Sequence, residues 1–145
     1  MAKIAVSACL LGHCCKYNGG HNKNQDVLDF LQDQGAEILP VCPETAGGLP
    51  RPRPPAEIQP DGRVVDNTGT DVTSAFEAGA KRELRRVMEA GCNSAVLKAK
   101  SPSCGVGQIY DGSFTGTLKT GDGIFAAKLR RAGVELFTEK ALPGK

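Results

Sequence analysis

Three short apolar segments of this chain, each with the composition of a buried β-strand, run into a cysteine. They are residues 3–8 before Cys9, residues 37–42 up to Cys42, and residues 95–99 ahead of Cys104. In an open parallel sheet, ligands bind in the crevice beyond the carboxyl ends of the strands. Three thiolates at that edge would form a metal or cluster site with one coordination position left open. The alternative is three ordinary buried thiols, since free cysteine is often buried.

Helical patterns separate these strands. Apolar residues recur with helical spacing over residues 25–33, 72–90 and 123–132, and a glycine follows each segment. A last strand is expected at residues 134–137. Alternating strands and helices predict an α/β fold, a three-layer, Rossmann-like, mostly parallel sheet flanked by helices with cysteines at the carboxyl ends of strands. The 145 residues are expected to form one domain, 1–145.

The segments between these elements are rich in glycine and proline. Pro60-Asp-Gly62 predicts a small hairpin, and residues 110–118 predict a turn or a second short hairpin. Residues 45–55 hold two glycines, four prolines and two arginines, which predicts a rigid irregular segment.

Composition excludes several classes of function. The formal charge is only +2, aromatic residues make up 5% of the chain and tryptophan is absent, which argues against a nucleic-acid surface. No apolar run is long enough to span a membrane, and the N-terminus lacks a secretory pattern. We therefore expect a cytoplasmic protein, in which six cysteines serve metal binding or catalysis more often than disulfides.

Polar residues lie next to two of the three cysteines. Glu44 follows Cys42 by two positions and is either a general base or a solvated loop carboxylate. Ser101 and Ser103 precede Cys104 and either direct hydroxyl groups into the crevice or form an ordinary turn. These three residues are the first candidates for catalytic groups.

Basic residues and further thiols allow several interpretations. Lys98 interrupts an apolar strand, so it faces the crevice or an ion pair. Arg53 either grips a carboxylate or phosphate or braces the proline-rich loop. The Cys14-Cys15 pair is a reserve ligand, a redox-active pair or incidental. A helical arginine cluster is a solvated face or an RNA-binding patch, and it comprises Arg82, Arg85 and Arg86.

The motifs taken together resemble the DUF523 family, which includes the thiouracil desulfidases. The resemblance spans nearly all 145 residues and indicates a short, single-domain member. It rests on Cys9-Leu-Leu-Gly12, Tyr17-Asn-Gly19, Cys42-Pro-Glu44, Gly47-Gly-Leu49, residues 52–58, residues 69–73, residues 98–105, Tyr110-Asp-Gly112 and Gly121-Asp-Gly123.

This resemblance implies a [4Fe-4S] cluster with three cysteine ligands and one open iron. The ligands would be Cys9, Cys42 and Cys104. It also implies a non-redox reaction, in which the thiocarbonyl sulfur of a thiolated uracil binds the open iron. In the implied reaction, water would attack the carbon and sulfur would leave as hydrosulfide, so that 2- or 4-thiouracil would become uracil.

The family pattern also assigns roles to nearby residues. Glu44 would activate the water, and Ser101 and Ser103 would orient the substrate or transfer a proton. Lys98, Arg53 and Tyr17 would bind the substrate. The expected partner is a small thiolated pyrimidine, a base or a nucleoside, because the low charge and few aromatic residues fit it better than tRNA.

Three alternatives stay open on the sequence. The chain could be an iron–sulfur or zinc module that binds or senses without turnover. It could be a desulfidase for 4-thiouridine in tRNA. It could also be a thiol-redox or RNA-interaction protein that uses Cys14-Cys15 or the helical arginines.

Overall fold

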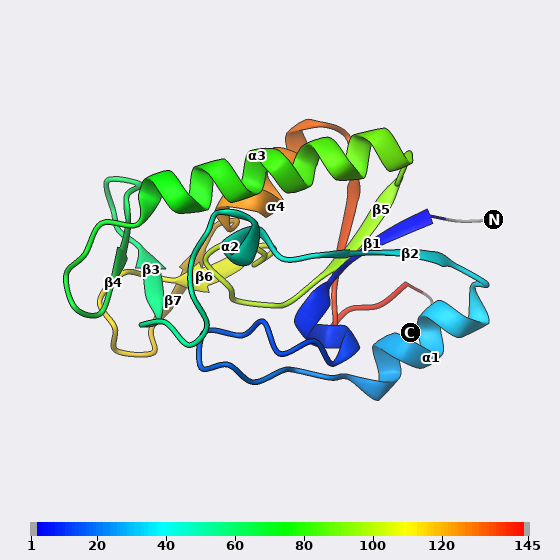
Figure 1. Cartoon of the computed structure of the whole chain (residues 1–145), viewed down its shortest axis with the longest axis horizontal. Coiled ribbons are helices and arrows are strands. Elements are labelled where there is room, and N and C mark those ends of the chain that lie inside the picture. The colour runs from blue at the N-terminus through cyan, green and yellow to red at the C-terminus, as the bar shows by residue number, and fades with distance from the viewer. Residues whose placement is uncertain (1–2, 144–145) are drawn as a thin grey trace.

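The computed structural model describes residues 3–143 as a four-stranded sheet with helices on both faces and two small hairpins beyond one end (Figure 1). No helix in this part of the chain is both long and apolar enough to cross a lipid bilayer. The elements in chain order are β1 (Lys3–Ser7), the 3-10 helix η1 (Ala8–Leu11), α1 (Gln25–Asp33), β2 (Glu37–Val41), α2 (Pro43–Ala46), β3 (Ala56–Ile58), β4 (Val64–Asp66), α3 (Thr73–Ala90), β5 (Ser94–Leu97), β6 (Gln108–Tyr110), β7 (Leu118–Thr120), α4 (Ile124–Arg131) and β8 (Glu135–Thr138).

The four strands of the main sheet are all parallel. Their order is β2-β1-β5-β8, so β1 and β5 are the central strands. Ala5 of β1 pairs with Leu39 of β2 on one side and with Ala95 of β5 on the other. Small and β-branched residues suit these positions, because both faces of a central parallel strand are covered. The predicted α/β class with a parallel sheet is confirmed.

Two hydrophobic clusters lie on opposite faces of the sheet. On one face α3 and α4 pack through Val87 and Leu129, which are fully buried against sheet residues such as Leu97. On the other face α1 packs through Val27 and Leu31. Each such aliphatic side chain contributes roughly 1.5–3 kcal/mol through burial. Helix, sheet and helix therefore form the three predicted layers (Figure 1).

Most element boundaries agree with the sequence pattern, and two short helices do not. The first helix spans Gln25–Asp33 as predicted, and the predicted hairpins appear as β3-β4 and β6-β7. The helices η1 and α2 were not predicted, because four residues make about one turn and carry no helical period. Pro43 opens α2 at a position where a missing N–H costs nothing.

The helix α2 lies directly against α3 through glycine. A Cβ atom built at Gly79 would overlap the carbonyl oxygen of Pro43 and lie 2.7 Å from the nitrogen of Gly47. At Gly47 a Cβ atom would overlap the carbonyl oxygen of Ala75. The two helix backbones therefore touch with no side chain between them, and this contact fixes the position of α2.

We expect Gly79→Ala to destabilise the protein, although alanine favours a helix interior over glycine by about 1 kcal/mol. The added methyl group must separate α2 from α3, and overpacking of this kind costs about 1–3 kcal/mol. Urea denaturation measures the free energy of unfolding of the variant and of the wild type. Lys81→Ala, at an exposed position of α3, is the matched control and should change it by less than about 0.5 kcal/mol. A variant Gly79→Ala that is as stable as the wild type would contradict the close packing.

Candidate active site

A cavity of about 630 Å³ opens beyond the carboxyl ends of the parallel strands. Its volume is typical of a small-molecule site. It is bounded by the ends of β1, β2 and β5 and by segments from the two hairpins. The wall contains every residue that was predicted to be catalytic, to bind substrate or to ligate the cluster, namely Cys9, Tyr17, Cys42, Glu44, Arg53, Lys98, Ser101, Ser103 and Cys104. Cys15 also lies in the wall, whereas Cys14 and the helical arginines do not line it.

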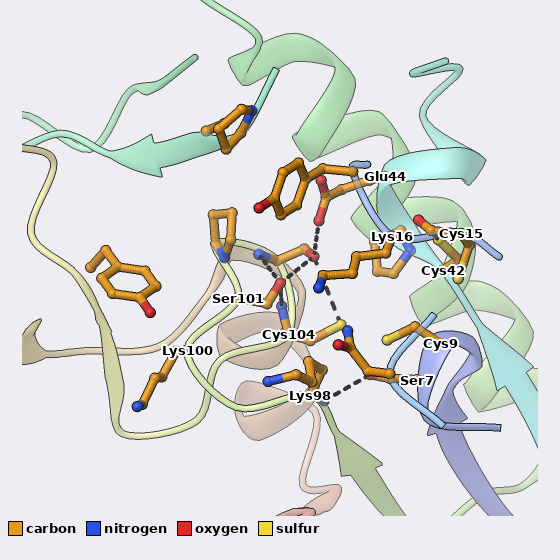
Figure 2. A pocket seen from close by; sticks show the side chains of 18 of the residues that line it. Ser7, Cys9, Cys15, Lys16, Cys42, Glu44, Lys98, Lys100, Ser101 and Cys104 are labelled. Atoms are coloured by element: carbon orange, nitrogen blue, oxygen red, sulfur yellow. Dashed lines mark hydrogen bonds between the residues drawn. The ribbon is translucent and has the colours of Figure 1, made fainter. Parts of the chain in front are cut away.

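The three cysteines reach the cavity from three separate segments (Figure 2). Cys42 directly follows β2 and occupies the N-cap position of α2. Cys9 lies in η1, two residues beyond β1. Cys104 comes seven residues beyond β5, in a loop, and its side chain is buried. The number of residues between the end of the strand and the cysteine thus differs among the three, and only Cys42 directly follows its strand.

The loop that carries Cys104 is anchored on the start of α4. The carbonyl oxygen of Ser103 accepts hydrogen bonds from the N–H groups of Phe125 and Ala126, at 2.9 and 3.1 Å. The first N–H groups of a helix lack partners within it, and this loop supplies them. Gly123 permits the approach, because a Cβ atom there would lie 2.5 Å from the carbonyl carbon of Ser103.

Cys15 lies between two of the other thiols. It is buried, and the Sγ atom of Cys42 lies 4.0 Å from its carbonyl oxygen. Hydrogen bonding by the Cys15 thiol lowers the pKa of Cys9 to about 7 and that of Cys42 to about 6. The pKa of Cys15 itself is raised, chiefly by its hydrogen bond to Cys42. Cys14, in contrast, is exposed, so the two neighbouring cysteines lie in different environments.

The cysteine set suits a group that contains iron. Thiolates are soft ligands, and a ligating cysteine must lose its proton. Burial raises the pKa of Cys104, so that thiol needs a nearby cation to ionise. Within residues 3–143, no three cysteine, histidine or acidic side chains are grouped tightly enough for a single metal ion. Wider spacing is compatible with a cluster, in which each thiolate binds a different iron.

A chain of hydrogen bonds joins the two serines to Glu44 (Figure 2). Ser101 Oγ accepts from the backbone N–H groups of Ser103 and Cys104, both at 3.1 Å. Its lone pairs are then occupied, so its own hydroxyl donates to Ser103 Oγ at 3.0 Å. Ser103 Oγ in turn donates to Glu44 Oε2 at 2.9 Å. The hydroxyl protons therefore all point toward the carboxylate.

Lys98 has both of the features that the sequence allowed. Its side chain lines the cavity, and its Nζ forms an ion pair with Glu139 Oε2 at 3.0 Å. Glu139 is almost buried and also accepts from the N–H of Ala99 at 2.7 Å. The N–H of Lys98 donates to Ser7 Oγ at 2.9 Å, which joins this segment to β1. These contacts hold the ammonium group at the edge of the cavity.

Several other residues of the wall were not singled out from the sequence. They include Lys16, Asn22, Asn67 and Phe114. Isolated loop asparagines are common in turns, so they gave no signal. Phe114 did give a signal in the sequence, since it is a large apolar residue in a glycine- and serine-rich turn with no helical or strand period. Glu139 was missed because it lies beyond the last predicted strand.

The arrangement combines soft ligands with a carboxylate and two hydroxyl groups. A soft metal centre at the thiols would bind a sulfur atom of a ligand. The carboxylate can accept a proton from water, and the hydroxyl groups can carry protons. Together these groups suit the attack of water on a carbon atom that bears sulfur.

Comparisons with known proteins agree with this chemistry. A model of the family described as 2-thiouracil desulfurase matches residues 4–141. A solved structure of the [4Fe-4S]-dependent thiouracil desulfidase TudS (DUF523Vcz) superposes with a TM-score of 0.90. That comparison covers 99% of this chain and 94% of the other, at 46% identity. The uncharacterized protein YbbK of Bacillus subtilis (strain 168) is 37% identical over 148 residues, which cover 96% of this chain and 97% of that protein.

Proposed function

Because this chain belongs to the 2-thiouracil desulfurase family, we propose that it is a [4Fe-4S]-dependent desulfidase that converts thiolated uracils to uracils. The observation that supports this most is the shared cavity. Four cysteines line it, three of which are the predicted ligands, together with a carboxylate that is hydrogen bonded to a serine pair. The reaction is hydrolytic and non-redox: thiouracil and water give uracil, hydrosulfide and a proton.

The cysteines at the cavity wall would hold the cofactor. Cys9, Cys42 and Cys104 supply three ligands, which leaves one iron without a protein ligand. When bound, the cluster supplies a Lewis-acidic iron with affinity for the thiocarbonyl sulfur. We place the protein in the cytoplasm, where thiols stay reduced, and the six cysteines are free in the structure.

Glu44 is the general base of this proposal. Its side chain is 17% exposed, so it reaches the cavity while most of its surface is shielded. One carboxylate oxygen accepts from Ser103 and the other from Arg53, and each oxygen keeps a further lone pair. A water molecule bound there gives its proton to Glu44 as its oxygen attacks the carbon that bears sulfur.

Ser103 and Ser101 would carry the proton away from Glu44. The hydrogen-bonded row runs from the carboxylate to Ser103 and on to Ser101. Once Glu44 is protonated, both hydroxyl groups turn round and one N–H bond to Ser101 Oγ gives way. Glu44 then gives its proton to Ser103, Ser103 gives its own to Ser101, and Ser101 releases its original proton at the cavity wall, so that each oxygen keeps one proton. From there it can reach the product.

The substrate would be held by the remaining part of the wall. Tyr17 is 40% exposed and offers an aromatic face and a hydroxyl group to a pyrimidine ring. The Lys98 ammonium group, held by Glu139, can donate to a carbonyl oxygen of the ring. A cavity of about 630 Å³ accommodates a free base or a nucleoside, so the substrate is a small thiolated pyrimidine.

Anaerobic reconstitution with iron and sulfide tests this function. We expect about four irons per chain and release of sulfide, with formation of uracil, from 2-thiouracil or 4-thiouracil. A protein that binds iron but releases no sulfide from any thiolated base or nucleoside would instead be a binding or sensing module. A single zinc ion, or no metal, would contradict the proposed cofactor.

A further inference from the structure

Arg53 lies in the wall of the proposed active site, and its side chain is only 6% exposed. Each of its three guanidinium nitrogen atoms donates to a protein group. Nε donates to Glu44 Oε1, Nη1 to the carbonyl oxygen of Pro50, and Nη2 to the carbonyl oxygen of Cys15, each at 3.1 Å. The planar fork that could grip a carboxylate or phosphate of a ligand is therefore already engaged.

These contacts join the proline-rich segment to α2 and to the first loop, in which Cys15 lies 38 positions before Arg53. Glu44 belongs to α2, Cys15 to the first loop and Pro50 to the proline-rich segment. The backbone N–H of Arg53 also donates to the carbonyl oxygen of Tyr17, at 2.6 Å. A buried guanidinium group requires a charged partner, and Glu44 provides it. Arg53 thus links the carboxylate to the loop that carries Cys15 and Tyr17.

We infer that Arg53 is a positioning residue, which fixes the carboxylate of Glu44, rather than a substrate-binding residue. This inference depends on the proposed role of Glu44 as the base. A glutamate side chain rotates about three bonds, and two hydrogen bonds restrict this one. Arg53 holds Oε1, so that Oε2 stays 2.9 Å from Ser103 Oγ. Without Arg53 the carboxylate rotates away from the serine pair and from the bound water.

Lysine does not replace arginine in this position. An ammonium group is a point charge on a flexible stem, and it does not reproduce the three donors directed to Glu44, Pro50 and Cys15. We therefore expect Arg53→Lys to behave almost as Arg53→Gln does, although it keeps the positive charge. This result separates geometric positioning from simple charge compensation.

The first test is steady-state kinetics of the reconstituted protein with its thiolated substrate. A small misplacement of a reacting group can cost as much as about 100-fold in rate, so we expect Arg53→Gln and Arg53→Lys to lower kcat by about 10- to 100-fold. We expect KM to stay within about threefold of the wild type, because a residue that only positions Glu44 contributes little to substrate affinity. Iron content should be unchanged. A large rise in KM with normal kcat would assign Arg53 to substrate binding and overturn the inference.

Arg51→Gln is the matched control. Arg51 lies in the same proline-rich segment, is exposed, and donates to the carbonyl oxygen of Cys14 at 3.1 Å. It thus resembles Arg53 in holding the first loop, but in the structure its side chain makes no hydrogen bond to Glu44. We expect its kcat to stay within about twofold of the wild type. An equal loss of kcat in Arg51→Gln would indicate that the loop, and not the carboxylate, is affected.

A double-mutant cycle shows whether Arg53 acts through Glu44. We expect the pair Glu44→Gln with Arg53→Gln to have about the same residual rate as Glu44→Gln alone. Independent, additive losses would contradict the inference.

A crystal structure of Arg53→Gln provides a readout that does not depend on activity. We expect the Glu44 carboxylate to leave Ser103 Oγ in the variant and to remain beside it in the wild type. A Glu44 side chain in the wild-type position in Arg53→Gln would overturn the positioning role. A wild-type protein without sulfide release, but with this rotation in the variant, would contradict the proposed function alone.

Discussion

Glu44→Gln is expected to lower the rate of sulfide release by about 100-fold or more, the range that general-base catalysis contributes. Glutamine has nearly the same shape as glutamate and can still contact Ser103 and Arg53, but it does not accept the proton of the attacking water. The cavity and the cysteine ligands should be unaffected. We therefore expect the iron content per chain, and the visible absorbance of the cluster, to match those of the wild type.

Glu89→Gln is the control for the loss of a carboxylate, because Glu89 is an exposed residue of α3. Its activity should equal that of the wild type. A reconstituted Glu44→Gln protein with full iron content and more than about a tenth of the wild-type rate would remove Glu44 from the role of base. A parallel loss of iron would indicate that Glu44 supports the cofactor site instead.

Cys104→Ala is expected to abolish both iron binding and sulfide release. A [4Fe-4S] cluster that loses one of three thiolate ligands has two open positions on the protein side, and its retention falls sharply. The expected iron content falls from about four per chain to well below one. Iron analysis and visible absorbance after identical anaerobic reconstitution measure the loss.

Cys92 and Cys15 make this experiment specific. Cys92→Ala removes a thiol that is as deeply buried as that of Cys104 but does not line the cavity. Cys92 packs in the core on the face of the sheet that α3 and α4 cover, so the iron content should not change. Cys15→Ala removes the thiol that lowers the pKa of Cys9 and of Cys42, and iron should again be retained. Loss of iron in Cys15→Ala together with full iron in Cys104→Ala would mean that Cys15, and not Cys104, is the third ligand.

The sequence predicted the main sheet and its helices because the helices have a strong helical period and the central strands are unbroken apolar runs. The helix Gln25–Asp33 is amphipathic, and buried apolar runs form the central strands. The helix α2 was missed, since a single turn has no period, yet it places Glu44 against the cavity. Short elements next to sites are therefore harder to predict than the scaffold that carries them.

Contacts between distant residues explain the rest of what the sequence left open. Glu44 and Ser103 were both candidates, but their hydrogen bond joins residues 59 positions apart and depends on how α2 and the Cys104 loop are oriented. Arg53 allowed two interpretations, and only its three short contacts favour the bracing one. Cys15 was one half of an ambiguous pair until burial separated it from the exposed Cys14.

The glycine contact between α2 and α3 has a consequence for laboratory evolution of new substrate preferences. Gly79 packs directly against the backbone of α2, with no side chain between them. Substitutions at that contact therefore cannot shift the position of Glu44 by small amounts. Selection would instead act on parts of the cavity wall that are formed by side chains. Examples are Tyr110 at the end of β6 and Phe114 in the turn that follows it. We expect the substitutions that alter the substrate range to occur at such positions, while the position of α2 stays unchanged.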